Sequence, residues 1–156
     1  MREGNESLRQ PKEVLLWSIA FPGFGQFLNK KYAKGIILIV LEFVININGN
    51  FNTVIINSFY GDIQEAIRQT NFQWLLFYPC VYFFSIWDAY KDAGGGREKF
   101  SYIPFVTSAW AVTIGLIYST SGEIGNIFGT IWFPMMCVIP GIIVGWIVKK
   151  ILKSRN

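Results

Sequence analysis

Three acids in apolar surroundings are the residues of this sequence most able to do chemistry. Glu42 lies seven residues beyond Gly35 in an apolar run, where an ionisable group is costly and marks a functional hypothesis. With Asn46 one helical turn later, Glu42 is a candidate proton or cation relay. The alternative is a structural contact with a polar side chain of another segment, for which the sequence offers Gln26, Tyr78 and Thr113.

Asp88 and Asp92 form the second acidic feature. They are four residues apart, so a helix places both carboxylates on one face. With Lys34 and Lys91 expected nearby, we interpret the two acids as part of a salt bridge at a membrane interface. The alternative is a metal-dependent enzyme acting on lipid, but two carboxylates without a third oxygen ligand make a weak divalent-metal site.

The composition excludes several classes of active site. The chain contains no His, which excludes a His-based catalytic triad and a His metal ligand. The two cysteines, Cys80 and Cys137, are too few for a disulfide framework or a four-Cys zinc site. We therefore expect no catalytic residues, no bound metal and no cofactor.

Long apolar segments must position these acids. Of 156 residues, 52% are hydrophobic and 15% are charged, against about 25% charged in an average soluble domain. The charged residues are separated by long uncharged stretches. Long helices that are apolar on every side are typical of membrane-spanning segments. We predict an all-α, polytopic integral membrane protein, with one membrane domain over 1–156 and spanning helices near 36–48, 73–90, 103–120 and 127–149.

A fifth apolar segment, near 14–28, contains a helix-break motif formed by Pro22, Gly23, Gly25 and Gln26. Proline lacks an N–H and clashes with the preceding helical turn, while glycine permits a sharp turn. Gln26 and Asn29 are expected to bond the carbonyls that Pro22 leaves unpaired. We predict a broken re-entrant or interfacial segment, whose motif is either a structural break or, as in some transporters, part of a binding site.

The basic residues favour one topology. If segment 14–28 returns to its own side and the other four segments cross, every basic residue except Arg68 lies on one face. If all five segments cross, the best orientation leaves four basic residues on the other face. Because cytoplasmic loops carry the excess of Lys and Arg, we predict four spans with both termini in the cytoplasm. The cytoplasmic cations are expected to attract anionic lipid headgroups, and the net charge of +4 needs no nucleic-acid partner.

The last apolar segment carries two packing signals. Gly141 and Gly145 form a G-x-x-x-G pattern, which lets two helices approach closely. The pattern serves either packing within the chain or dimerisation. Pro134 and Pro140 are expected to kink this helix unless neighbouring groups repair the backbone.

The longer extracytoplasmic loop, 48–71, is rich in Asn. Within it, Asp62 and Glu65 have capping-box spacing before an apolar pattern. We predict a short amphipathic helix there, covering the outer ends of the spans.

The stretch Pro22-Gly23-Phe24-Gly25-Gln26, followed by Lys34-Gly35, resembles the opening segment of small bacterial membrane proteins related to the two-transmembrane-domain family. There an apolar helix ends in a Pro-Gly-apolar-Gly-Gln-aromatic turn, and Lys/Arg-Gly begins the next helix. The stretch Trp87-Asp88-Ala89-Tyr90 is similar to the Asp-Ala-Tyr stretch that ends the paired helix in such proteins. The resemblance implies a membrane location and this architecture, and no particular reaction.

Taken together, these patterns predict a non-enzymatic protein of the bacterial plasma membrane. We expect a scaffold or accessory subunit of a membrane complex, acting as a homo-oligomer or with a membrane protein partner. The alternative is a small transporter or channel that uses the broken segment and Glu42.

Overall fold

The computed structural model of this chain describes residues 10–155, and in that range every regular element is a helix. The predicted all-α class is confirmed. In chain order the helices are α1 (Pro11–Ala20), α2 (Phe24–Leu28), α3 (Tyr32–Gly49), α4 (Phe51–Tyr60), α5 (Ile63–Gln69), α6 (Phe72–Leu75), α7 (Tyr78–Asp92), α8 (Ile103–Tyr118) and α9 (Gly122–Ser154). Of these, α3 and α9 are long and apolar enough to cross a membrane. Arg2 and Arg9, which the topology argument includes, lie outside the described residues.

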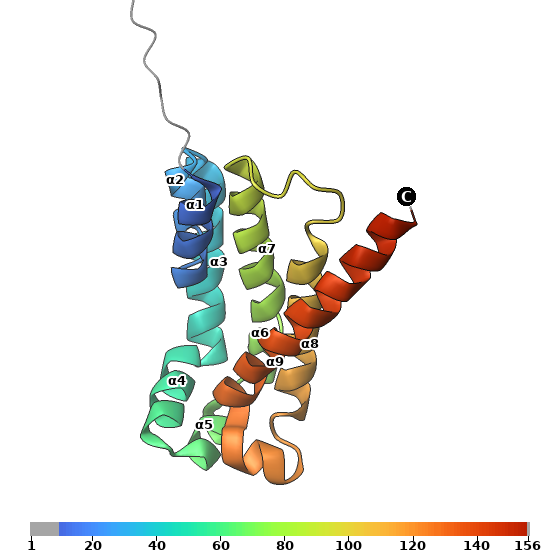
Figure 1. The fold of residues 1–156 in the computed structure, drawn as a ribbon. Coiled ribbons are helices and arrows are strands. Elements are labelled where there is room, and N and C mark those ends of the chain that lie inside the picture. The colour runs from blue at the N-terminus through green and yellow to red at the C-terminus, as the bar shows by residue number, and fades with distance from the viewer. Residues whose placement is uncertain (1–9, 156) are drawn as a thin grey trace, which may run out of the picture.

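The N-terminal segment folds into a helical hairpin. Its turn contains Pro22 and Gly23, and Gly23 has a φ of +97°, a left-handed conformation that glycine adopts without steric cost. Leu28, at the end of α2, packs against the buried cluster of Val14, Ala89 and Ala93. A Cβ at Gly25 of α2 would lie 3.2 Å from Val14 Cγ1, near the start of α1. The chain therefore returns along α1 to the end of the bundle from which it started, and α3 then runs along the bundle toward α4 (Figure 1).

The predicted span near 73–90 is divided into α6 and α7. The two helices are separated at Leu76 and Phe77, and Pro79 lies in the first turn of α7. Proline is favoured at the start of a helix, where its missing N–H has no intrahelical partner. A single continuous helix over this segment was therefore the wrong expectation.

Two helices occupy the predicted outer loop, at the end of the bundle opposite the α7–α8 connection (Figure 1). The expected short helix is present as α5, and the Asp62 side chain accepts a hydrogen bond from the Glu65 N–H, as the capping pattern predicts. The sequence analysis did not predict α4. It follows α3 after Asn50, whose φ of 56° is left-handed, a conformation that Asn tolerates better than most residues.

The C-terminal helices α8 and α9 pack against each other side by side. Gly141 lies against the Ser108 backbone and Gly145 against that of Pro104, so the G-x-x-x-G face contacts α8. The departure from helical geometry inside α9 is at Gly129, with φ 61° and ψ −163°. The backbone break thus precedes Pro134 and Pro140, where the sequence placed the kink. A Cβ at residue 129 would contact Ile63 of α5, so the absence of a side chain at this glycine also lets α5 approach.

The distribution of side chains departs from the soluble pattern in two ways. Several of the most buried side chains are small and polar, namely Ser18, Ser85, Ser108 and Thr130, each at most 1% exposed. Large apolar side chains point outward, with Phe43, Ile47, Ile139 and Trp146 each at least 65% exposed. The hydroxyls of Ser18 and Ser108 donate to carbonyls one turn earlier in their own helices, so these buried groups are satisfied locally.

Candidate functional site

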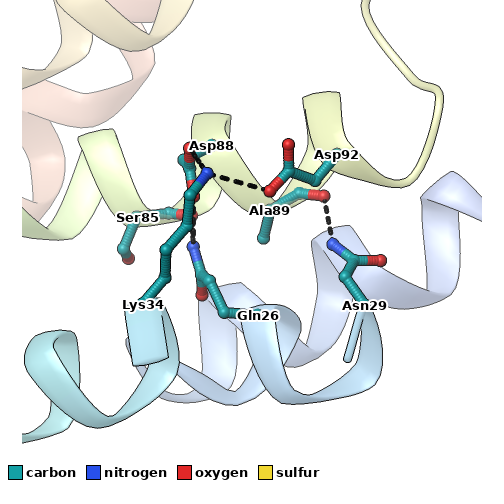
Figure 2. Close-up of polar contacts among 7 residues, drawn as sticks. All are labelled: Gln26, Asn29, Lys34, Ser85, Asp88, Ala89 and Asp92. Atoms are coloured by element: carbon teal, nitrogen blue, oxygen red, sulfur yellow. Dashed lines mark hydrogen bonds and ion pairs between the residues drawn. The ribbon is translucent and has the colours of Figure 1, made fainter. Parts of the chain in front are cut away.

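The densest polar cluster joins the N-terminal hairpin to the end of α7. We call it the polar clamp: the side chains of Gln26, Asn29, Lys34, Asp88 and Asp92, with the carbonyls of Ser85 and Ala89 (Figure 2). It unites two of the predicted site groups, the helix-break motif and the acid pair. Residues about 60 positions apart in the sequence thus meet at one end of the bundle.

Gln26 is the buried member of the polar clamp, and its side chain is 0% exposed. Its Nε2 donates to the Ser85 carbonyl at 2.9 Å and to Asp88 Oδ2 at 3.2 Å. Asn29 Nδ2 donates to the Ala89 carbonyl at 2.8 Å. These amides therefore bind the backbone of α7, and the expectation that they bond carbonyls freed by Pro22 was wrong. The hairpin turns its amides toward α7 because α2 runs beside it.

Lys34 forms a salt bridge with each of the two acids. Its Nζ lies 2.7 Å from Asp88 Oδ1 and 3.0 Å from Asp92 Oδ2. The carboxyl side chains are 17% and 23% exposed, and that of Lys34 is 48% exposed. The salt bridge expected from sequence is thus formed by Lys34, which lies in the first turn of α3. Because α2, α3 and α7 all contribute, the polar clamp fixes these three helices relative to one another.

Small residues make the close approach at the polar clamp possible. A Cβ at Gly25 would lie 2.7 Å from the Ala89 Cβ and would overlap the Ser18 hydroxyl. A Cβ at Gly35 would lie 2.8 Å from the Phe27 ring. The helix-break motif therefore supplies both the turn, at Gly23, and the contact surface, at Gly25. Its polar residue Gln26 then reaches the α7 backbone from short range.

The polar groups of the polar clamp are largely paired with one another, which limits the chemistry that the site can perform. The acids are paired with Lys34 and the amide donors with α7 carbonyls. Over residues 10–155, no three or more His, Cys, Asp or Glu side chains lie together as a metal site would require. One acceptor is left over, because Gln26 Oε1 is buried without a hydrogen-bond partner in the structure.

Glu42 lies deeper along α3, apart from the polar clamp. It is 6% exposed, and its partner is the Tyr78 hydroxyl, one of the contacts offered by the sequence. Its Oε2 atom is buried with no hydrogen-bond partner in the structure. Asn46, the expected neighbour in a relay, instead donates to Asn52 Oδ1 at 3.0 Å. Asn46 therefore shares a face of α3 with Glu42 but directs its amide to Asn52.

A large apolar cavity, which we call the central groove, runs between two walls. One wall comes from α1, α4 and α7 and the other from α8 and α9, and the volume is about 1320 Å³. Tyr78 and Tyr82 line it from α7, so the partner of Glu42 faces this space. The groove was not predicted from the sequence, because no local pattern indicates how far α8 and α9 stand from α1, α4 and α7.

A second contact that the sequence analysis missed anchors the hairpin tip. The Tyr82 hydroxyl donates to the Ile19 carbonyl at 2.6 Å, near the end of α1. The break at residues 21–23 leaves carbonyls at the end of α1 without intrahelical donors. A tyrosine within an apolar helix was the available signal, since a buried phenol needs a partner.

Comparisons with known proteins do not assign a family. The chain matches no protein-family model, and searches of the curated proteins and of the solved structures returned no match.

Proposed function

We propose that this chain is a four-span integral membrane protein of a bacterial plasma membrane, with α1 and α2 as a re-entrant hairpin. The observation that carries the proposal is the outward-facing apolar surface of the helices, where Phe43, Ile47 and Ile139 are at least 65% exposed. Many large apolar side chains are exposed in this way along α3, α8 and α9, and extensive exposed apolar surface is unusual on a soluble monomer. Lipid tails solvate such a surface as well as another helix would.

The proposed spans are α3, α6 with α7, α8, and α9. A helix needs about 20 residues to cross the hydrocarbon, although shorter stretches cross where the bilayer thins. At 15 and 16 residues, α7 and α8 are below that length. The preceding α6 extends the path of α7, and the turn at residues 100–102 extends that of α8.

The proposed orientation places the polar clamp at the cytoplasmic face. Lys30, Lys31 and Lys34 lie near the start of α3, at the same end of the bundle as the α7–α8 connection and the end of α9 (Figure 1). Arg68 lies on α5, at the other end. The excess of basic residues at one end supports a cytoplasmic assignment for that end.

Single-cysteine labelling in cells tests this topology, in a background without Cys80 and Cys137. Lys12, Lys30 and Asn52 are exposed positions for the reporter cysteine. We expect a membrane-impermeant maleimide to label the cysteine at 52 in intact cells, and those at 12 and 30 only after permeabilisation. Opposite sidedness of 12 and 30 would mean that the N-terminal segment crosses the bilayer.

We infer that the protein acts without catalysis, as a scaffold or accessory subunit in a membrane complex. The pairing within the polar clamp supports this inference, because side chains that are hydrogen-bonded or ion-paired with one another are suited to holding helices in place. The resemblance to the two-transmembrane-domain family agrees with this architecture. Its two sequence pieces meet at the 3.2 Å contact between Gln26 and Asp88.

Cross-linking in native membranes before solubilisation tests the scaffold function. We expect a defined product, either a homo-oligomer or a complex with one membrane protein, that persists through size-exclusion chromatography in mild detergent. A single-chain mass in detergent, together with no cross-linked product in membranes, contradicts the scaffold function. Labelling of the topology reporters shows independently whether the chain was inserted.

A small transporter or channel is the second candidate, and one specific observation favours it. Glu42 is buried, has an unpaired oxygen, and contacts Tyr78 on the wall of the central groove. Ionisable groups inside membrane helices commonly mark ion or proton paths. In proteoliposomes, this candidate requires a proton or cation flux that Glu42→Gln abolishes while the protein remains folded. Equal flux in both proteins removes Glu42 from any transport mechanism.

A further inference from the structure

We propose that the central groove binds an anionic phospholipid, with the headgroup at the cytoplasmic mouth and the acyl chains along the groove. This inference rests on the proposed membrane location. The volume of about 1320 Å³ exceeds the roughly 300–1,000 Å³ of typical small-molecule pockets. The groove therefore has room for an occupant larger than an ordinary metabolite.

The groove is long enough to hold an acyl chain. Its lining on α9 extends from Thr130 to Lys149, a rise of about 29 Å at about 1.5 Å per residue. The hydrocarbon of a bilayer is about 30 Å thick. At the outer end, Val54, Ala66 and Ile131 pack together and join the two walls. An acyl chain can therefore lie along the groove, from the cytoplasmic mouth toward this closed end.

The interior of the groove is apolar and aromatic. Phe83 and Ile86 of α7 face Val112 and Leu116 of α8 and the apolar side chains of α9 across this space. Polar groups on the walls engage their own helices or their neighbours, as in Ser108, whose hydroxyl donates to the Pro104 carbonyl. Hydrocarbon is the ligand chemistry that such walls accommodate without loss of hydrogen bonds.

The charges lie at one mouth only. Among the described lining residues, Arg97 and Lys149 are basic and Glu98 is acidic. Glu98 lies 3.0 Å from Lys149 and 3.7 Å from Lys153, so a net positive charge remains. Arg97 uses its Nε to donate to the Gly94 carbonyl, which orients the guanidinium at the mouth. A phosphate group suits this arrangement, because arginine binds phosphate through several N–H donors.

Trp146 completes the mouth. It lines the groove one turn before Lys149, whose ammonium lies 5.9 Å from the indole ring centre. Tryptophan is enriched where the hydrocarbon meets the headgroups. The order along α9, from apolar residues through Trp146 to Lys149, therefore follows the order of acyl chain, interface and phosphate in a phospholipid.

Native mass spectrometry of the purified full chain tests the proposal. The protein is delipidated in detergent and incubated with either phosphatidylglycerol or phosphatidylcholine. We expect one retained phosphatidylglycerol per chain at an occupancy at least fivefold above that of phosphatidylcholine. Equal retention of the two lipids, or retention of neither, overturns the proposal.

Two pairs of matched variants locate the lipid. Val112→Trp fills the groove, whereas Val106→Trp places the same side chain on the 51% exposed outer face of α8. Lys149→Ala removes a cation at the mouth, whereas Lys150→Ala removes its exposed neighbour. We expect Val112→Trp and Lys149→Ala to lower phosphatidylglycerol occupancy at least fivefold, and each control to leave it unchanged.

The outcomes separate this inference from the proposed function. If each variant binds as its control does, the lipid lies on the general surface and the groove proposal fails. The mouth variant leaves the apolar packing intact, so it remains informative if Val112→Trp does not fold. Correct sidedness of the topology reporters combined with absent lipid selectivity would leave the membrane function standing and overturn the groove proposal alone.

Discussion

The two ends of the chain hold their helices together by different chemistry. The N-terminal hairpin is attached to α7 by amide-to-carbonyl hydrogen bonds and by the Lys34 ion pairs. The α8–α9 pair relies on close approach at Gly141 and Gly145, which lie against the backbone of Ser108 and Pro104.

The difference follows from the continuity of the backbone. A broken hairpin exposes carbonyls and amides at its helix ends, and polar side chains must satisfy and anchor such a segment in hydrocarbon. Two longer helices satisfy most of their backbone internally, so close van der Waals packing suffices to join them. The comparison predicts that steric changes affect the C-terminal pair, and that changes in polarity and salt affect the hairpin.

The largest effect is expected from Gly141→Leu. A Cβ at this position would lie 2.7 Å from the Ser108 Cα, so α8 and α9 must separate. Overpacking commonly costs about 1–3 kcal/mol, and a full leucine at a backbone contact belongs at or above the upper value. Thermal unfolding in detergent measures the loss. As control, Gly49→Ala is expected to be nearly neutral, because its Cβ would meet no atom closer than 3.8 Å.

The second effect is expected at Gln26. Gln26→Leu removes both amide hydrogen bonds to α7 and leaves Asp88 with one partner fewer. We expect a loss of about 1–3 kcal/mol, the range for an unmade buried hydrogen bond. Hydrogen exchange should localise the added mobility to α1 and α2. Equal exchange throughout the bundle would argue against a separate role for the polar clamp.

A smaller effect is expected for Lys34→Met. The variant leaves Asp88 and Asp92 facing each other without their shared cation, but the lysine is 48% exposed, so solvent screens the interaction. We expect a loss of about 1 kcal/mol, reduced in high salt. Adding Asp88→Asn and Asp92→Asn should recover part of the stability. A loss insensitive to salt and unrelieved by these changes would indicate a packing role instead.

The smallest effect concerns pH and the mouth of the central groove. Lys149, through a hydrogen bond and its charge, holds the pKa of Glu98 below its usual range. A lowered carboxyl pKa in the folded state gives a contribution that is present above the unfolded pKa of about 4.3. That contribution is lost as the pH falls through the folded-state value. Glu98→Gln should flatten a weak acid-dependent loss of stability, measured by unfolding between pH 6 and 3. An unchanged acid profile would show that this pair does not contribute.

Local patterns in the sequence predicted the helical class and the position of the hairpin break. Proline and glycine act through their own backbone, so the turn at residues 21–23 could be recognised without tertiary information. The Asp62 cap is local for the same reason. The split between α6 and α7 was missed because the apolar composition is continuous across it.

The partners of the polar residues depended on tertiary packing. Gln26 and Asn29 were recognised as carbonyl-binding residues, but which carbonyls they bind depends on α2 lying beside α7. Asn46 shares a helix face with Glu42, yet Asn52 after the helix end captures its amide. The central groove arises because α8 and α9 stand apart from α1, α4 and α7. No local spacing of residues in the sequence encodes that separation.

A cross-linking experiment tests most directly whether the N-terminal segment returns. Cysteines are placed at Val14 and at Leu28, which packs against the buried cluster that contains Val14, in a background without native cysteines, and are oxidised in membranes. Leu16 paired with Leu28 is the control, because Leu16 is 66% exposed. We predict a rapid disulfide for 14 with 28 and little for 16 with 28. Failure of the 14–28 pair to form, with reporters at 12 and 30 labelled on opposite sides, would show a continuous crossing and contradict the account.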